Sequence, residues 1–400
     1  MSMIPFSFEP TRAAGLSRLA DFAPRTGRHY AANRNTDEGA GERGNVSMLS
    51  PYLRFRMISE EEVLQTVLSR FSLSSAEKFI QEVFWRAYFK GHLETRPQIW
   101  TNYLDDLQRL DRDLADYQTA IHGQTGIDCF DHWVEELKTT GYLHNHARMW
   151  FASIWMFTLK LPWQLGADFM YRHLIDGDPA SNTLSWRWVG GLHTKGKTYL
   201  ARPDNIATYT NGRFQPRGLA TVALPLQETH VLDAPLMPQA MGQWPEGEYG
   251  LLVTSEDLQL PSSTTPMSIA VPAKPKHKPG GVESNVALDF RASALEDAAR
   301  RLGSNVVRIP SLSAEAVLTW CQSEGIRTVA VAYTPVGPES EALLLVEQRL
   351  AKHDISLIRV RRRYDTTTWP HTSKGFFNLK EKLPMLLEKL NLQGTQGQLI

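Results

Sequence analysis

The stretch YRHLIDGDPASNTLSWRWVGG, residues 171–191, combines acids, small polar residues and large aromatic side chains in one short segment. Asp176 and Asp178 flank a glycine, and Trp186 and Trp188 follow two positions apart. An acid pair indicates a metal ion or another cation to neutralise, whereas paired tryptophans indicate an aromatic partner or a route for electrons. The stretch alone leaves these alternatives open, so the rest of the chain has to decide between them.

The composition narrows the class of protein. The 400 residues carry 43 Lys and Arg against 43 Asp and Glu, so no global charge indicates a nucleic-acid binder, although a local basic patch stays open. The two cysteines, Cys129 and Cys321, exclude a four-cysteine metal or iron–sulfur site and favour a reducing compartment. No apolar run reaches the ~20 residues of a membrane helix, and the amino terminus lacks signal-peptide features. We therefore expect a cytoplasmic monomer without membrane contacts.

The first half of the chain is predicted to be helical. Ser59 and the acids after it are typical of the start of a helix over residues 59–71, and Gly141 is a typical helix stop. Residues 144–163 are apolar almost all round, which predicts a buried helix that stops near Pro162. Most of the tryptophans also fall in this half, so we expect the large aromatic cores here.

The second half changes character near residue 216. A stretch without periodicity and with several prolines predicts a linker, and the later segment AKPKHKPGG (273–281) is a basic loop. Short apolar runs alternate with helical patterns, which predicts a parallel, doubly wound sheet. The strand candidates are residues 249–255, 267–273, 305–310, 328–333 and 355–360. The predicted organisation is a helical domain over 1–215, a linker over 216–247 and a Rossmann-like α/β domain over 248–400.

Four motifs mark the helical half: NVSMLSPYL (45–53), EVFWRAYF (82–89), TTGYLHNHARM (139–149) and LIDGDPASNTLSWRW (174–188). Their order and spacing resemble those of the flavin-binding helical domain of the photolyase/cryptochrome family. Three positions depart from the family pattern. Val46 replaces a flavin-loop Thr, Tyr142 replaces a Trp, and His146 stands where many members carry Arg.

The second half also resembles this family, but in an unexpected order. LLVTSEDLQL (251–260) is similar to the first strand and turn of the family's α/β domain, which precedes the helical domain there and follows it here. A circular permutation explains this order, and an unrelated Rossmann-like domain fused downstream is the alternative. This half has neither a G-x-G-x-x-G fingerprint nor a P-loop. The resemblance leaves room for an antenna chromophore, which the sequence does not identify.

The resemblance implies FAD as the cofactor and a set of residues that hold it. Asp176 would pair with Arg148 against the flavin ring, Asp178 would lie beside its polar edge, and Asn182 would face its N5 atom. The other implied FAD contacts are Tyr30, Ser47, Leu49, Ser50, Arg86 and Asn145. Because reduced flavin and its diphosphate carry negative charge, cations and donors suit such a site. A divalent metal is the alternative for the Asp-x-Asp pair alone, and we expect none.

The resemblance also implies a pocket for a pyrimidine dimer in damaged DNA. An extruded dimer needs aromatic walls and polar groups that read its base edges. Trp85 and Trp188 match the walls, Met149 matches a sulfur contact, and Glu82 matches a carboxyl that hydrogen-bonds the dimer. The remaining implied substrate or phosphate contacts are Arg34, Asn145 and Arg202.

Other aromatic residues match the family's electron relay. Trp186 and Trp163 correspond to its first two positions, which reduce the flavin under light. The third has no clear match, with Trp100, Trp150 and Trp155 as unranked candidates, and ordinary core packing explains most tryptophans. His144 and His146 look like a chelating pair, but residues two apart on a helix point about 200° away from each other.

Two functions are consistent with this pattern. The first is a light-driven photolyase, a carbon–carbon lyase that transfers an electron from reduced FAD to a cyclobutane pyrimidine dimer. Its implied catalytic residues are Glu82, Met149, Trp163, Asn182 and Trp186. The second is a cryptochrome-like blue-light photosensor or FAD-binding protein without repair activity. The intact dimer-pocket residues favour the first function, whereas the departures at Val46 and His146 favour the second.

Overall fold

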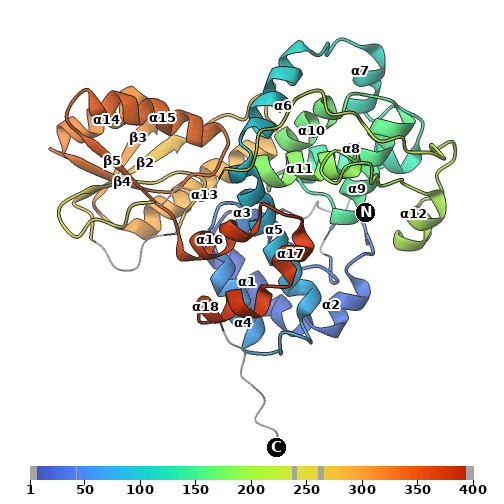
Figure 1. Ribbon diagram of the computed structural model, residues 1–400, viewed down its shortest axis with the longest axis horizontal. Coiled ribbons are helices and arrows are strands. Elements are labelled where there is room, and N and C mark those ends of the chain that lie inside the picture. The colour runs from blue at the N-terminus through green and yellow to red at the C-terminus, as the bar shows by residue number, and fades with distance from the viewer. Residues whose placement is uncertain (1–6, 42, 237–240, 260–264, 393–400) are drawn as a thin grey trace, which may run out of the picture.

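A parallel five-stranded sheet lies beside a larger helical body in the computed structural model of the chain (Figure 1). The structure describes residues 7–41, 43–236, 241–259 and 265–392. Residues 237–240 of the expected linker and the outermost residues of both expected domains lie outside the described residues.

The helical body begins with two groups of helices. The first group contains α1 (Arg12–Phe22), η1 (Ala23–Arg25), α2 (Arg28–Asn33), α3 (Ser50–Arg54), α4 (Glu60–Leu68) and α5 (Glu77–Thr95). The second group contains α6 (Gln98–Arg109), α7 (Ala115–Ile121), α8 (Asp128–Thr140), α9 (Asn145–Ser153), the π-helical turn η2 (Ile154–Thr158), α10 (Trp163–His173), α11 (Pro179–Val189) and α12 (Pro203–Tyr209).

The sheet and its helices form an α/β lobe over residues 250–360. It contains β1 (Gly250–Leu252), β2 (Ser268–Lys274), α13 (Asn285–Leu302), β3 (Val306–Ser311), α14 (Ala314–Ser323), β4 (Thr328–Ala332), α15 (Pro338–Ala351) and β5 (Ser356–Val360). Short helices follow the lobe: α16 (Arg363–Thr368), η3 (Trp369–His371), α17 (Phe376–Lys380) and α18 (Leu383–Lys389).

Local sequence explains where several helices begin and end. Ser59 caps α4 in a capping box with Glu62, in which each side chain accepts the other residue's backbone amide. Gly141 ends α8 with a φ of 66°, a left-handed conformation that suits glycine. The long apolar segment after His144 does not stay α-helical throughout, because η2 interrupts it before Pro162.

The predicted parallel, doubly wound sheet is confirmed, in the order β3-β2-β1-β4-β5. Successive strand residues alternate between the two faces of the sheet. Leu251 and Ala330 pack on the face that α13 covers, whereas Leu252 and Val331 pack under α14 and α15. Both faces are therefore buried, as a parallel sheet requires.

The last described segment differs from the expected domain division. An α/β domain extending to residue 400 was predicted, but the sheet ends at Val360 and α16, η3 and α17 pack against α5. Tyr364, Phe376 and Leu386 share one hydrophobic core with the first group of helices. Figure 1 shows α16–α18 beside α1, α4 and α5 rather than over the sheet. Residues 363–392 are therefore part of the helical body.

The expected linker has neither helix nor strand in its described residues, and it crosses from the helical body to the sheet (Figure 1). Leu226 donates its amide to the carbonyl of Gly190 over 2.9 Å, and Leu236 donates to Thr95 over 2.8 Å. This segment is thus held along the helical body. In the described ranges, none of the helices combines the length and apolar character that crossing a bilayer takes.

We expect Gly280→Ala to destabilise the junction between the lobe and the helical body. Gly280 has a φ of 98°, and a Cβ there would lie 1.7 Å from Oδ1 of the buried Asp168 on α10. Gly196→Ala is the matched control, because Gly196 has a φ of 81° with no atom within 4 Å of the added Cβ. The control should lose about 1–2 kcal/mol from backbone strain, and Gly280→Ala a further ~1–3 kcal/mol from overpacking. Urea unfolding measures both, and equal losses would contradict this contact.

Candidate functional site

The loop between α10 and α11 carries the two acids of the opening stretch, and hydrogen bonds fix its course. Ile175 donates its amide to the carbonyl of Gly141 over 2.8 Å. Asp178 caps α11, because its Oδ1 accepts from the amides of Ala180 and Ser181 at 3.0 Å each. The sequence Asp-Pro after a tight loop is a favourable helix start, so the two acids are held in fixed positions.

Asp176 and Arg148 form an ion pair. Arg148 donates Nη2 to Asp176 Oδ2 over 2.9 Å and Nε to the carbonyl of Leu143 over 2.9 Å. Its guanidinium also lies 5.2 Å from the ring centre of Tyr142. The other oxygen of Asp176, Oδ1, is buried and has no hydrogen-bond partner among the described residues. The site therefore holds an oriented cation next to an unused acceptor.

Asp178 has different partners, at the junction with the α/β lobe. Its Oδ2 lies 2.9 Å from Nζ of Lys90 and 3.5 Å from Nε of Arg54. Arg54 also donates to the carbonyl of Gly177 over 2.8 Å and to both oxygens of Glu256 over 2.7 and 2.6 Å. Burial alone would raise the pKa of Asp178, but Lys90 and Arg54 lower it far below its usual range. Both oxygens are engaged, so a contact with the flavin edge stays a prediction.

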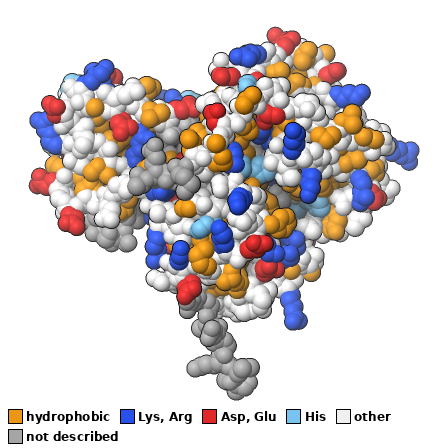
Figure 2. Space-filling model, in the orientation of Figure 1, with side chains coloured by type: hydrophobic (Ala, Val, Ile, Leu, Met, Phe, Trp, Pro, Cys, Tyr) orange, Lys and Arg blue, Asp and Glu red, His pale blue; other side chains and the backbone are white. Residues whose placement is uncertain are grey.

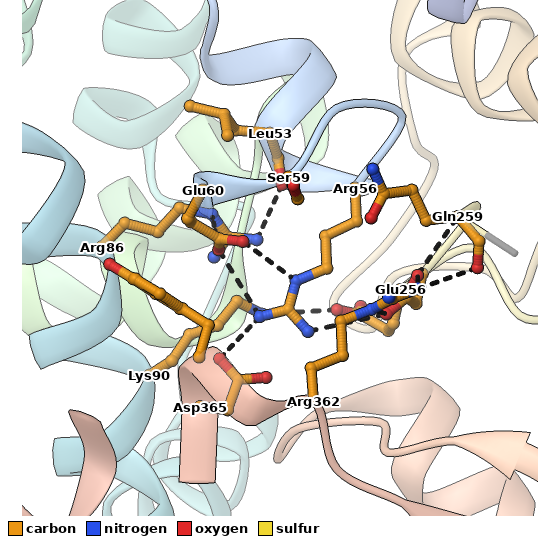
Figure 3. A network of polar contacts seen from close by, with 12 residues as sticks. Leu53, Arg56, Ser59, Glu60, Arg86, Lys90, Glu256, Gln259, Arg362 and Asp365 are labelled. Carbon is orange, nitrogen blue, oxygen red and sulfur yellow. Dashed lines mark hydrogen bonds and ion pairs between the residues drawn. The ribbon is translucent and has the colours of Figure 1, made fainter. Parts of the chain in front are cut away.

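More buried charges adjoin these residues, and Figure 3 shows several of them. We call the whole set the junction network: Arg54, Arg56, Glu60, Arg86, Lys90, Asp178, Glu256 and Asp365. Arg56 lies 2.6 Å from Asp365 of α16 and 3.2 Å from Glu60 of α4. Arg86, an implied FAD contact, lies 3.4 Å from Glu60 and donates Nη2 to the carbonyl of Leu53 over 2.8 Å. Burial would raise the pKa of Glu60, but Arg56 and Arg86 lower it to about 2. Arg86 thus joins α5 to the network.

The basic loop after β2 also reaches the acid-bearing loop. Lys278 is 4% exposed and donates Nζ to the carbonyls of Tyr171 and Leu174 over 2.7 and 3.0 Å. A cation suits these carbonyls, because they lie at the carboxyl end of α10. Burial and Arg291 lower the pKa of Lys278 to about 7, although Glu283 at 3.4 Å opposes the shift. The sequence predicted only a basic loop here and missed this contact.

Asn182 and Trp186 project from α11 toward α10. Asn182 is 8% exposed and donates Nδ2 to the carbonyl of Ala167 over 2.9 Å. Trp186 is 2% exposed, and its Nε1 has no partner among the described residues. A Cβ on Gly166 would lie 2.3 Å from the Trp186 ring and 2.8 Å from that of Trp155. Glycine at this position therefore lets both indoles approach α10 closely.

The ring contacts rank the candidate relay residues. Trp186 contacts Trp155 with ring centres 6.2 Å apart and planes at 90°. Trp163, the expected second position, instead stacks on Tyr103 at 5.5 Å and 27°, and Tyr103 in turn contacts Trp100 at 5.5 Å. Trp155 is thus the indole in ring contact with Trp186 among the described residues. The roles of all these rings in electron transfer stay predictions.

Glu82 lies near Arg34, at the corner between α5 and α2. Arg34 Nε is 4.0 Å from Glu82 Oε1, and 44% of the Glu82 side chain is exposed. Nevertheless, desolvation by surrounding protein raises the pKa of Glu82, while Arg34 and Lys78 oppose the rise. The Glu82 carboxyl is therefore open to solvent on one side and in contact with protein on the other. Burial and the charge of Glu82 also hold the pKa of Tyr30 well above its usual value.

The two expected dimer walls each contact another ring of this chain. Trp85 stacks on Phe376 of α17 with ring centres 3.7 Å apart and planes at 11°. Trp188 stacks on Tyr199 at 5.9 Å and 29°. Met149 is half-buried on α9. The sequence analysis did not identify Phe376, because nothing in residue type or spacing indicates that this residue of α17 covers Trp85.

The remaining implied site residues differ in exposure. Leu49 is 2% exposed and lies in the core, whereas Ser47 is half-buried and Ser50 is exposed at the start of α3. Asn145 is the exposed first residue of α9, and the side chain of Arg202 at the start of α12 is 63% exposed. Their roles toward cofactor or DNA stay predictions.

The two histidines of the third motif have separate structural partners. His144 donates Nε2 to the carbonyl of Arg34 over 3.1 Å, and His146 donates Nδ1 to the carbonyl of Asn35 over 2.9 Å. Burial lowers the pKa of His144 to about 4, so its ring is neutral near pH 7. Together they attach α9 to the end of α2. Within the described ranges, no three His, Cys, Asp or Glu side chains gather as metal ligands.

Comparison with known proteins matches the helical body to one family. Residues 79–218 match the family model described as the FAD binding domain of DNA photolyase. A deoxyribodipyrimidine photo-lyase of Streptomyces griseus is 32% identical over 46% of this chain and 39% of its own length. One from Alkalihalophilus pseudofirmus is 30% identical over 51% of this chain and 42% of its own. The chain thus spans about two fifths of the length of these relatives.

A cryptochrome structure from Synechocystis is 26% identical, with a TM-score of 0.45, over 51% of this chain and 44% of its own.

Residues 79–218 are similar to the FAD binding domain of DNA photolyase. Three of the four motifs of the helical half lie inside the matched range, whereas the flavin loop at 45–53 precedes it and the α/β segment at 251–260 follows it. The site also fits this cofactor on its own chemistry. A flavin ring carries one imide N–H, and Asp176 Oδ1 is a buried acceptor without a partner. Arg148 adds the cation that an anionic flavin needs.

We expect Asp178→Asn to remove the negative charge of this residue while keeping its helix cap. Asn still caps α11, but Lys90 and Arg54 lose a buried anion, so unfolding free energy should fall by about 3 kcal/mol at neutral pH. The folded-state pKa of Asp178 is lowered, so its contribution is complete above about pH 4 and is lost as the pH falls further. Urea unfolding from pH 7 to about pH 3 should therefore show a shallower acid loss in Asp178→Asn than in wild type. The exposed Asp289→Asn is the control, and parallel pH profiles for all three proteins would contradict the pairing.

We expect Asp176→Ala to weaken FAD binding roughly tenfold to a hundredfold, because it removes the partner of Arg148 and the unused acceptor together. Asp176→Asn keeps an acceptor oxygen and should lose less. Flavin absorbance after reconstitution and the rise in Tm on adding FAD provide two measurements. Asp289→Ala is the control for a general loss of charge. A folded Asp176→Ala protein with wild-type affinity would exclude this residue from the FAD site.

Proposed function

We propose that this chain is a flavin-dependent enzyme that uses light to repair cyclobutane pyrimidine dimers in DNA. The match of residues 79–218 and the names of the relatives support a photolyase-type reaction. The observation that carries the proposal is the Glu82 carboxyl, whose side chain is 44% exposed and lies 4.0 Å from Arg34, while desolvation by surrounding protein raises its pKa. Such a group suits recognition of a neutral base that has left the DNA stack.

The raised pKa of Glu82 determines what this carboxyl can do. A carboxylic acid that keeps its proton to higher pH donates a hydrogen bond to a pyrimidine carbonyl, whereas a carboxylate only accepts. When charge develops on the base, a donor aimed at its carbonyl oxygen strengthens its hydrogen bond. Glu82 would therefore bind the dimer and stabilise it further once it carries an extra electron.

The chain's other residues would orient and isolate the reactants. Reduced FAD, when bound, supplies the electron that light moves onto the dimer and that returns after the two carbon–carbon bonds of the cyclobutane ring break. Arg148, held by Asp176, offers a fixed cation to the cofactor, and the oriented amide of Asn182 offers its oxygen. The buried Trp186 excludes water on the α11 side.

DNA binding would depend on cations such as Arg34 and Arg202. Arg202 is exposed, with a side chain 3.6 Å from Asp204, and Arg34 is available beside Glu82. Contacts from such side chains to phosphates release counterions, so affinity should fall steeply with salt. The chain has no net charge, which makes this local placement more important than any global field.

One observation favours a second candidate function, a blue-light photosensor or FAD-binding protein without repair activity. Phe376 covers one face of Trp85, the residue implied as a dimer wall. A dimer must then use the other face of Trp85 or displace Phe376, at the cost of a stacking contact of about 1 kcal/mol. A photosensor that keeps the flavin but docks no DNA needs neither.

The test is illumination of FAD-reduced protein with dimer-containing oligothymidine, followed by recovery of thymine absorbance. We expect Glu82→Ala to slow repair about a hundredfold while binding weakens less, because its donor matters most when charge develops. Glu82→Gln, which still donates, should retain more repair. Wild-type repair should decline as the pH rises through the pKa of Glu82, which desolvation raises, and Glu82→Gln should lack this decline.

Glu77→Ala, on the same helix, is the matched control for the Glu82 variants. Absence of recovery in wild-type protein with fully reduced FAD would favour the photosensor. Equal repair by wild type and Glu82→Ala would leave the photolyase reaction but remove Glu82 from it.

A further inference from the structure

A pocket of about 370 Å³ opens between α6, the start of α10 and residues 226–230 of the extended segment. Its volume falls in the range of small-molecule sites, which is ~300–1,000 Å³. The lining includes Trp163 but none of the residues implied to contact FAD or DNA. The pocket is therefore a separate feature of the helical body.

The floor of the pocket is apolar and largely aromatic. Tyr103, Met156, Leu161 and Trp163 line it with exposed fractions of 2, 6, 7 and 8%. Tyr103 and Trp163 stack on each other, which holds both rings in place. A floor of this kind favours a planar apolar group, because it removes ring surface from water without reorganising the protein.

One hydrogen-bonded pair and one ion pair link residues on the rim. Asp106 accepts from Nε2 of Gln164 over 3.1 Å and pairs with Nε2 of His230 at 2.9 Å. Arg187 pairs through Nη2 with Glu228, whose side chain is 31% exposed. These pairs close the pocket by tying the extended segment to α6 and α11.

Lys160 adds a further positive charge to the lining of the pocket. It is exposed, adopts a left-handed conformation with a φ of 57°, and forms no ion pair with any described residue. A lysine in this conformation is strained, and such strain is concentrated at functional sites. Arg187 and Glu228 offset each other, so Lys160 is the lining cation that remains available to an anionic group.

We propose that this pocket binds a planar aromatic carboxylate. Its rings would lie on the apolar floor, and its carboxylate would lie at the rim near Lys160 and Arg187. The volume suits an acid of about two fused rings. Apolar burial and one charge contact account for this class of ligand, and neither depends on FAD or on DNA repair.

The experiment is calorimetric titration of the FAD-reconstituted chain with 2-naphthoate, and with 2-naphthol as a neutral analogue. We expect naphthoate to bind at submillimolar concentration and more tightly than naphthol. Lys160→Gln should weaken naphthoate binding about fivefold, as the loss of an exposed ion pair does. Glu228→Gln should tighten it about threefold, because it removes a repelling carboxylate and frees Arg187. Neither variant should change naphthol binding.

Two further variants locate the probe. Lys195→Gln, at another exposed lysine, should leave naphthoate binding unchanged. Leu192→Trp should fill the pocket and abolish binding, with an unchanged unfolding midpoint showing that the protein remains folded. Undetectable binding up to about 1 mM would overturn the proposal. So would equal affinity for acid and alcohol, or binding that persists in a folded Leu192→Trp protein.

Discussion

The need to pair buried charges determines how the helical body and the α/β lobe pack against each other. Arg54, Lys90, Asp178 and Glu256 are all at most 7% exposed, and each compensates another. A buried charge that loses its partner costs about 3–5 kcal/mol, so none of these residues can move alone. They come from α3, α5, the start of α11 and the loop after β1. The position of the α/β lobe therefore determines the geometry of the acid-bearing loop.

The lobe reaches the same loop a second time through Lys278, which donates to the carbonyl of Tyr171. Arg54 holds the carbonyl of Gly177, and a Cβ on Gly177 would lie 2.9 Å from Lys278 Nζ. Arg54 and Lys278, which come from different elements, thus both lie close to Gly177, the residue between Asp176 and Asp178. The loops after β1 and β2 thus fix the position of the acid-bearing loop.

Patterns of short range were sufficient to predict much of the fold. The alternation seen at Leu251 and Leu252 follows from the pleat of a buried strand, and Ser59 and Gly141 are local signals for helix ends. The resemblance likewise placed Arg148 and Asp176, which are 28 residues apart and form an ion pair. These features depend on residue type and near-neighbour spacing, which a sequence displays directly.

Pairing across long distances was not accessible in the same way. Arg54 and Glu256 are separated by 202 residues, and Arg56 and Asp365 by 309. Neither periodicity nor charge identifies the partner of a lone arginine. The stack of Trp85 on Phe376 could not be predicted for the same reason. An apolar face on a helix shows that something covers it, but it does not show which residue.

The closure of α5 by α16 and α17 has a consequence for biosynthesis. Residues 77–95 leave the ribosome well before residues 363–392, which complete the hydrophobic core around them. At ~5–20 residues per second, the interval is on the order of tens of seconds. During that time the apolar face of α5 that later meets Tyr364 and Phe376 has no cover from its own chain. An exposed apolar face of this kind is prone to aggregation, so the nascent chain is most vulnerable before residues 363–392 are made.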